Sequence, residues 1–164
     1  MNKLPKRKNI RIPEYDYSQC GAYFITICTK DRRRILGDIV GARLGAPENE
    51  PICIELSFLG KIVEKHLLDI ENHYDNVSID KYVIMPNHIH LIIMIEGAPR
   101  RAPTIGDIIC AFKSGVSREC GKSIWQRNYY EHIIRNETDY IETWHYIVNN
   151  PLQWELDRYY TKEL

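Results

Sequence analysis

The stretch VSIDKYVIMPNHIHLIIMIE, residues 77 to 96, indicates a pair of β-strands. It contains two runs rich in β-branched and other apolar residues, and only Met85, Pro86 and Asn87 separate them. Proline and asparagine at such a point are typical of a tight connection, so the two runs are predicted to form adjacent antiparallel strands. The second run is apolar on both faces, which indicates a central strand of a sheet.

The remaining elements follow from hydrophobic periodicity and turn signals. Strands are predicted at residues 22–30 and 124–136, a loop at residues 41–51, and helices at residues 56–70, 104–120 and 137–150. The expected N-terminal caps of these helices are Ser57, Thr104 (in a capping box with Asp107) and Asn136. Pro151 is expected to end the last helix.

The resulting order is strand, helix, strand, strand, helix, strand, helix. It predicts an α+β, ferredoxin-like (RRM-like) fold, in which helices pack on one face of an antiparallel sheet and a C-terminal helix is added. The same layout serves RNA-recognition domains and unrelated enzymes, so the fold alone does not decide the function. The 164 residues are expected to form one domain, with a basic arm at residues 1–12 and a C-terminal tail at residues 152–164.

Charge is balanced in total but segregated along the chain. Twenty-two Lys and Arg residues offset twenty-two Asp and Glu residues, yet residues 1–12 contain Lys6, Arg7 and Lys8 and no acid. Such an arm is either a solvated tail or a phosphate-binding segment. Five cysteines form no C-x-x-C pair, no signal peptide is recognisable, and the longest apolar run is too short for a bilayer. A cytoplasmic protein with no membrane partner is expected.

His88 and His90 stand one residue apart at the start of the second apolar run. Side chains of a strand alternate between its faces, so the two imidazoles point the same way and Ile89 points to the other side. Such a pair can share one divalent ion. Buried imidazoles without partners are costly, and either a metal ion or hydrogen bonds remove that cost. Two interpretations remain: a metal site, or one histidine at the strand end with the other hydrogen-bonded in the core.

The final predicted helix carries an apolar stripe and one aromatic residue outside it. The stripe consists of Tyr140, Ile141, Trp144, Ile147 and Val148. Tyr146 lies off the stripe, and Asn150 follows one turn later on the same face as Tyr146. If the helix packs beside the histidine strand, the phenol and the amide face the imidazoles. Otherwise Tyr146 lies against a loop and Asn150 caps the helix before Pro151.

Four blocks, in this order, resemble one known family. They are D-Y-S-Q-x-G-x-Y-F-I-T-I-C-T, M-P-N-H-I-H-L, W-Q-R-x-Y-Y-E-H-I-I-R and Y-I-V-N-N-P-L-x-W. Together they resemble the REP-associated tyrosine transposases, a branch of the single-tyrosine HUH transposases (HUH denotes His, hydrophobe, His). The resemblance implies an enzyme that depends on Mg²⁺ or Mn²⁺, with Zn²⁺ also open. It would cut single-stranded DNA next to hairpins through a 5′-phosphotyrosine intermediate.

Residue by residue, the resemblance implies that His88 and His90 are metal ligands and that Tyr146 is the nucleophile. Asn150 stands where mobile-element relatives have glutamine as a third ligand, and its side chain is one methylene shorter. The resemblance also implies a cytoplasmic, nucleoid-associated protein. Both a monomer and a homodimer are compatible with it.

Aromatic and basic residues are expected to contact the DNA strand. The candidates for DNA binding are Lys6, Arg7, Lys8, Arg100, Arg101, Lys113, Arg118, Trp125, Arg127 and Tyr130. Tyr129 and Tyr130 are rival nucleophiles, and we interpret them as one core residue and one residue that stacks on DNA. The alternative for the other candidates is ordinary surface charge and, for Trp125, a half-buried ring.

Three functions compete. The leading hypothesis is a metal-dependent strand transferase that acts through Tyr146. The second is a non-catalytic DNA-hairpin-binding protein that retains the fold, motivated by Asn150 in place of glutamine. The third, an RNA-recognition sheet, is weaker, because histidines occupy the place of the aromatic residues such sheets present.

Overall fold

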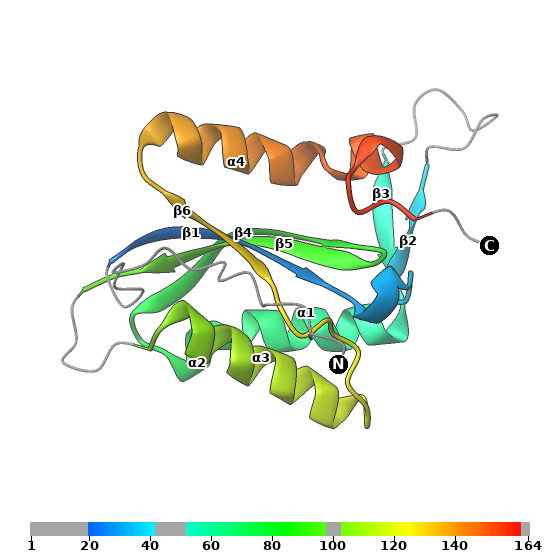
Figure 1. Cartoon of the computed structure of the whole chain (residues 1–164), viewed down its shortest axis with the longest axis horizontal. Coiled ribbons are helices and arrows are strands. Elements are labelled where there is room, and N and C mark those ends of the chain that lie inside the picture. The colour runs from blue at the N-terminus through cyan, green and yellow to red at the C-terminus, as the bar shows by residue number, and fades with distance from the viewer. Residues whose placement is uncertain (1–19, 42–51, 98–102, 162–164) are drawn as a thin grey trace, which may run out of the picture.

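The computed structural model describes residues 20–41, 52–97 and 103–161. Its centre is a four-stranded antiparallel sheet with the strand order β4, β5, β1, β6 (Figure 1). The strands are β1 (Gly21–Cys28), β4 (Val77–Met85), β5 (His88–Ile95) and β6 (Tyr130–Ile134). The pairing of β4 with β5 confirms the prediction for the stretch that joins them.

Helices cover both faces of this sheet (Figure 1). One face carries α1 (Phe58–Leu68), α2 (Ile70–His73) and α3 (Ile105–Glu119), and the other carries α4 (Glu137–Asn149). This arrangement confirms the predicted α+β fold with an added C-terminal helix. It also places α4 over the face of the central strands opposite to α1 and α3.

The central strand β5 belongs to two hydrophobic cores. Ile89, Leu91 and Ile93 lie in the large core beneath α1 and α3. Ile92 lies in a smaller core beneath α4, together with Phe24 of β1. Each such aliphatic side chain contributes about 1.5–3 kcal/mol on burial, so β5 is held firmly from both sides.

The predicted caps are present at the N-termini of three helices. Ser57 and Asn136 each accept a hydrogen bond from the backbone N–H three residues later, at 3.0 and 2.9 Å. Thr104 and Asp107 form the reciprocal capping box. Caps of this kind contribute about 1 kcal/mol each, so these helices begin where local chemistry dictates.

Two short strands that the sequence did not predict, β2 (Gly37–Val40) and β3 (Cys53–Leu56), form a separate antiparallel hairpin. Each strand has four residues, which is too few for a period-two pattern to stand out. The predicted loop at 41–51 joins them, and residues 42–51 lie outside the described part of the chain.

Two other predictions need correction. The last strand is shorter than expected, since β6 covers only 130–134 and Trp125 joins the sheet through an isolated bridge. The predicted stripe of α4 is wrong in part, because Ile141 and Val148 are 45% and 38% exposed. Thr143 is buried instead. The buried face of the helix is therefore rotated toward Thr143.

Pro151 ends α4 as predicted and begins the 3-10 helix η2 (Pro151–Leu156). The chain then runs back to the start of β5, where the Tyr159 carbonyl accepts a hydrogen bond from Asn87. The described part of the predicted C-terminal tail is thus packed against the sheet. The predicted basic arm at residues 1–12 lies outside the described residues.

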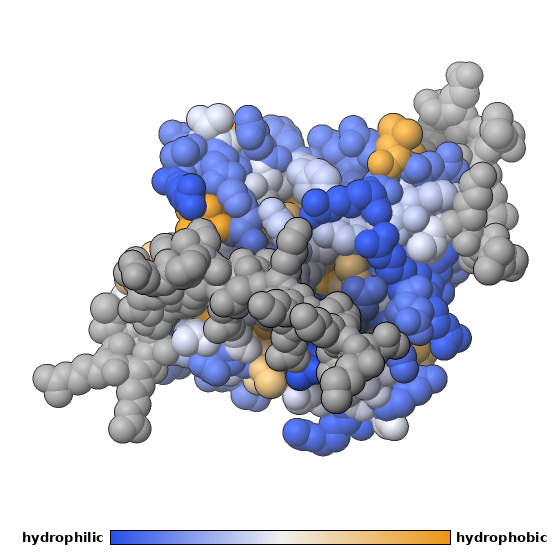
Figure 2. Space-filling view, in the orientation of Figure 1, coloured by the Kyte–Doolittle hydropathy of each residue, from blue (hydrophilic) through white to orange (hydrophobic). Residues whose placement is uncertain are grey.

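Around α4 the surface is mainly hydrophilic, with isolated apolar patches (Figure 2). Large apolar side chains are exposed there at Ile141, Val148, Leu152 and Leu156. Within residues 20–41, 52–97 and 103–161, no helix combines the length and the apolar character needed to cross a membrane.

Gly60 lets α1 pack closely on the segment that supports the β4–β5 turn. A Cβ atom at Gly60 would overlap the Leu36 carbonyl oxygen, and the Leu36 N–H donates to the Pro86 carbonyl at 3.0 Å. Because main-chain atoms must shift, Gly60→Ala should lower the free energy of unfolding by about 1–3 kcal/mol, measured by urea denaturation. Lys61→Ala, at an exposed position, should change it by less than about 0.5 kcal/mol. Equal stability of Gly60→Ala and wild type would contradict this packing.

Candidate metal and tyrosine site

The two histidines of β5 lie side by side on the face of the sheet beneath α4. Their Nε2 atoms are 2.9 Å apart, and both side chains are fully buried. Ile89 packs in the opposite core, as the alternation predicted. Two ligand atoms at about 2.1 Å from one ion and at right angles lie about 3.0 Å from each other. The pair therefore has the spacing of neighbouring ligands of one octahedral ion.

Hydrogen bonds hold the far side of each imidazole ring. Asn87 Oδ1 lies 2.7 Å from His88 Nδ1, and Thr26 Oγ1 lies 2.8 Å from His90 Nδ1. The Tyr159 ring covers both imidazoles, at centroid distances of 4.8 and 5.7 Å. Burial lowers the pKa of His88 to about 4 and the pKa of His90 well below its usual value. Both rings are neutral at neutral pH, the state in which imidazole binds metal.

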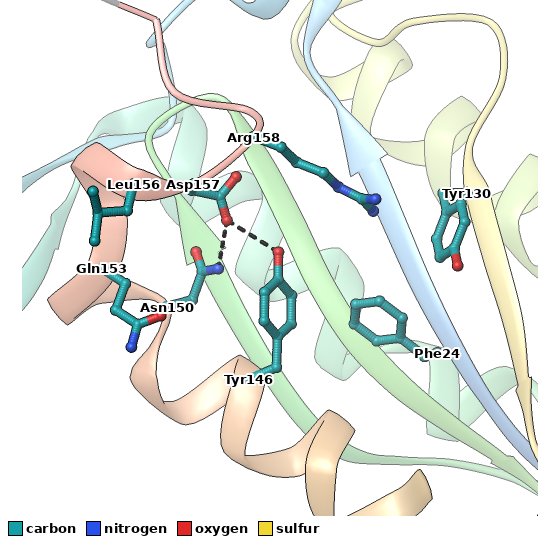
Figure 3. Close-up of a pocket in the computed structure, with 8 residues that line it drawn as sticks. All are labelled: Phe24, Tyr130, Tyr146, Asn150, Gln153, Leu156, Asp157 and Arg158. Atoms are coloured by element: carbon teal, nitrogen blue, oxygen red, sulfur yellow. Dashed lines mark hydrogen bonds between the residues drawn. The ribbon is translucent and has the colours of Figure 1, made fainter.

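Asp157 brings a carboxylate to the pair. One ligand atom from each of His88, His90 and Asp157 lies within 4.8 Å of the others. Asp157 Oδ2 also accepts hydrogen bonds from the Tyr146 hydroxyl at 3.0 Å and from Asn150 Nδ2 at 2.7 Å (Figure 3). Carboxylate oxygen suits Mg²⁺ and Mn²⁺. Sequence analysis missed Asp157, because it lies in no predicted helix or strand and in no ligand-spacing motif.

Tyr146 and Asn150 lie at the end of α4 that meets the histidines, which is the first of the two alternatives that their shared face left open. The Tyr146 ring packs edge-on against His90 at 5.0 Å and against Phe24 at 5.9 Å. Burial, and then the neighbouring Asp157 carboxylate, raise the pKa of Tyr146. Asn150 is 2% exposed, and its Oδ1 makes no hydrogen bond within the described part of the chain. A buried acceptor in this state costs about 1–3 kcal/mol, which a coordinated cation would offset.

A cavity of about 340 Å³ opens beside Tyr146 (Figure 3). Phe24, Tyr130 and Tyr146 form its aromatic wall, and the Arg158 guanidinium lies over the Tyr130 ring at 5.1 Å. Tyr129 instead packs against the large core, so the two adjacent tyrosines point to opposite sides, as predicted. Aromatic rings beside a guanidinium are the groups that single-stranded nucleic acid stacks on.

The other predicted DNA contacts lie away from this cavity or outside the described residues. Lys113 donates to three main-chain carbonyls in residues 126–128, at 2.7 to 3.4 Å. Trp125 is buried in the core beneath α3. The placement of these two side chains supports structural roles, whereas Arg118 and Arg127 are exposed. The candidates outside the described residues are Lys6, Arg7, Lys8, Arg100 and Arg101.

Acid should destabilise the metal-free protein through the histidine pair. An imidazole in the unfolded chain takes up a proton near pH 6.5, whereas burial holds the folded-state pKa of His88 at about 4. The unfolded state therefore gains protons first. The stability contribution of the neutral rings is complete above about pH 6.5. It falls toward pH 4 by up to about 1.4 kcal/mol per pH unit for each histidine.

Urea denaturation with a chelator, repeated across this pH range, measures that slope. His88→Gln should make the slope smaller, and His73→Gln, at an exposed position on α2, should leave it unchanged. An unaltered slope in His88→Gln would show that the neutral His88 ring does not contribute.

Sequence comparison finds relatives of this chain, although no protein-family model matches it. An uncharacterized protein of Haemophilus influenzae is 37% identical and covers 94% of this chain and 93% of its own length. A candidate REP-associated tyrosine transposase of the same organism is 26% identical over 84% of this chain and 74% of its own length. The REP-associated tyrosine transposase of Escherichia coli is 35% identical over 46% of this chain and 45% of its own length.

The fold has a counterpart among solved structures. A REP-associated tyrosine transposase bound to a REP hairpin superimposes with a TM-score of 0.64 and 21% identity, over 90% of this chain and 77% of that one. At this identity the likeness shows the shared fold, and the named relatives add the likeness in sequence. In sequence and in fold together, the chain is similar to the REP-associated tyrosine transposases.

Proposed function

We propose that this protein is a metal-dependent endonuclease and strand transferase that cuts single-stranded DNA next to hairpins through a 5′-phosphotyrosine intermediate. The observation that carries the proposal is the meeting of Tyr146 with the histidine pair, its ring lying 5.0 Å from that of His90. The names of the relatives support transposase-like DNA cleavage, and the hairpin bound to the similar structure supports the substrate class.

His88 and His90 would hold the ion through their Nε2 atoms, and Asn150 and Asp157 would supply oxygen. The 2.9 Å separation of the two nitrogens and the unpartnered Asn150 Oδ1 support this assignment. A mixed nitrogen and oxygen set suits Mn²⁺ and is tolerated by Mg²⁺. When bound, such an ion acts as a Lewis acid on a phosphate oxygen.

Tyr146 would supply the nucleophile. Attack by its phenolic oxygen forms the bond to phosphorus and breaks the bond to the 3′ oxygen, which takes a proton from solvent and leaves as a 3′-OH. Asp157 Oδ2 already accepts a hydrogen bond from this phenol, so it is placed to take the phenol proton and to return it in the reverse step. The intermediate keeps the phosphodiester energy, so rejoining needs no ATP.

Tyr130 and Arg158 would contact the strand beside the scissile phosphate, because both line the cavity next to Tyr146. The proposed partner is single-stranded DNA that carries hairpins. All the proposed catalytic groups belong to one chain, so the proposal requires no second subunit and holds for a monomer and for a homodimer.

A hairpin-binding protein without efficient cleavage is the second candidate. One observation favours it: both histidines are fully buried, with the Tyr159 ring over them. If that ring stays over the imidazoles, it would shield an ion on their Nε2 atoms from a phosphate oxygen, and cleavage would require the segment that contains Tyr159 to move.

Tyr146→Phe should abolish covalent attachment to DNA. Wild-type protein mixed with Mn²⁺ and a hairpin-bearing single-stranded oligonucleotide should give an adduct that survives SDS. Tyr146→Phe should give at least about 10³-fold less, because no other atom replaces the nucleophile. Tyr140→Phe is the matched control on the same helix, since that hydroxyl bonds Asp80 instead, and it should react as wild type does. An undiminished adduct in Tyr146→Phe would overturn the proposal.

Changing both histidines separates the two candidates. The variant with His88→Ala and His90→Ala should lose the adduct and keep hairpin affinity within a few-fold, as measured by fluorescence anisotropy. A chelator should act on the wild type in the same way. Hairpin binding by a wild type that forms no adduct with Mn²⁺, Mg²⁺ or Zn²⁺ would establish the second candidate instead.

A further inference from the structure

The side chain of Asn87 is fully buried between the histidine pair and the C-terminal segment. Its Oδ1 lies 2.7 Å from His88 Nδ1. Its Nδ2 lies 2.8 Å from the Tyr159 carbonyl oxygen, 3.2 Å from the Arg32 carbonyl oxygen and 3.3 Å from Thr161 Oγ1. One amide thus joins a candidate metal ligand to two segments distant in sequence.

The two carbonyls decide which way this amide faces. A carbonyl oxygen only accepts hydrogen bonds, so the NH₂ end of Asn87 must point to Arg32 and Tyr159. Its oxygen must then face His88. An oxygen acceptor at that place requires the proton of the neutral imidazole to be on Nδ1, which leaves the lone pair on Nε2.

We propose that Asn87 is a positioning residue for the metal site. It holds His88 in the Nδ1–H tautomer with Nε2 open to an ion, and the Tyr159 carbonyl helps to set the orientation of the amide. Hydrogen bonds to the far nitrogen of a ligating histidine commonly fix its tautomer and ring direction. The metal-binding part of this inference rests on the proposed function, whereas the tautomer is measurable without metal.

The same hydrogen-bond network gives the two histidines different tautomers in the metal-free protein. Because His88 Nε2 can only accept, His90 Nε2 at 2.9 Å must donate to it in the metal-free protein. His90 Nδ1 then accepts from the Thr26 hydroxyl. An ion bound to both Nε2 atoms requires the His90 proton to move to Nδ1, where Thr26 becomes the acceptor. His88 needs no such change, so it is the preset ligand of the pair.

The ¹⁵N chemical shifts of the imidazole rings in metal-free wild type test the tautomer directly. The expected result is a protonated Nδ1 and an unprotonated Nε2 for His88, with the reverse for His90. A proton on His88 Nε2 would overturn the proposal, and this measurement needs no variant to fold.

Two substitutions separate the acceptor from the donors of Asn87. Asn87→Asp keeps an oxygen for His88 and loses the NH₂ group, whereas Asn87→Leu loses both at similar size. Mn²⁺ titration followed by electron paramagnetic resonance should show Asn87→Asp within about threefold of wild type, or tighter. Asn87→Leu should bind about 10–100-fold more weakly. Wild-type affinity in Asn87→Leu, or an equal loss in both variants, would overturn the positioning role.

If Asn87→Leu does not fold, Asn87→Asp still tests the positioning role, because the proposal requires His88 to keep the Nδ1–H tautomer in that variant. Failure of this inference is distinguishable from failure of the proposed function. Mn²⁺ binding and the expected tautomer without any adduct would contradict the proposed function alone. An adduct from a wild type whose His88 carries its proton on Nε2 would contradict this inference alone.

Discussion

The two-residue alternation of β5 determines which of its side chains face α4 and which enter the large core. Ile89 is anchored in the core beneath α1 and α3, so His88 and His90 must face α4. A slip of one residue would put both imidazoles in the apolar core and expose the isoleucine to the site. The pairing of β5 with β1 places Thr26 opposite His90, where its hydroxyl reaches the ring. Core packing thus sets the direction of the candidate metal-binding pair.

Later parts of the chain bring three further polar groups to that pair. The last turn of α4 contributes the Tyr146 phenol and the Asn150 amide, and the segment after η2 contributes the Asp157 carboxylate. Burial, and then this carboxylate, raise the pKa of the phenol, and the carboxylate is also the group placed to receive the phenol proton. Asn87 ties this same segment to His88, so the positions of carboxylate and imidazole are linked.

Much of the fold is local in origin and was predictable for that reason. The β4–β5 connection, three helix caps and the shared direction of His88 and His90 all follow from neighbours along the chain. Asp157 and the tautomer of His88 were not predictable, because they depend on where an irregular segment returns to the sheet. Trp125 left two alternatives open in the sequence, DNA stacking and a half-buried ring, and its ring is buried in the core beneath α3. The four-residue strands β2 and β3 were too short to leave a pattern.

Tyr146, which α4 places over the histidine pair, is the residue proposed to attack DNA through its phenolic oxygen. Mass spectrometry of the protein–DNA complex, digested by trypsin and by nuclease, identifies the residue that carries the phosphate. The expected result is a nucleotide joined through its 5′ phosphate to Tyr146, in the tryptic peptide that follows Arg135 and ends at Arg158. The same modification on Tyr129 or Tyr130 would contradict this assignment. Those residues precede Arg135, so trypsin places them in a different peptide from Tyr146.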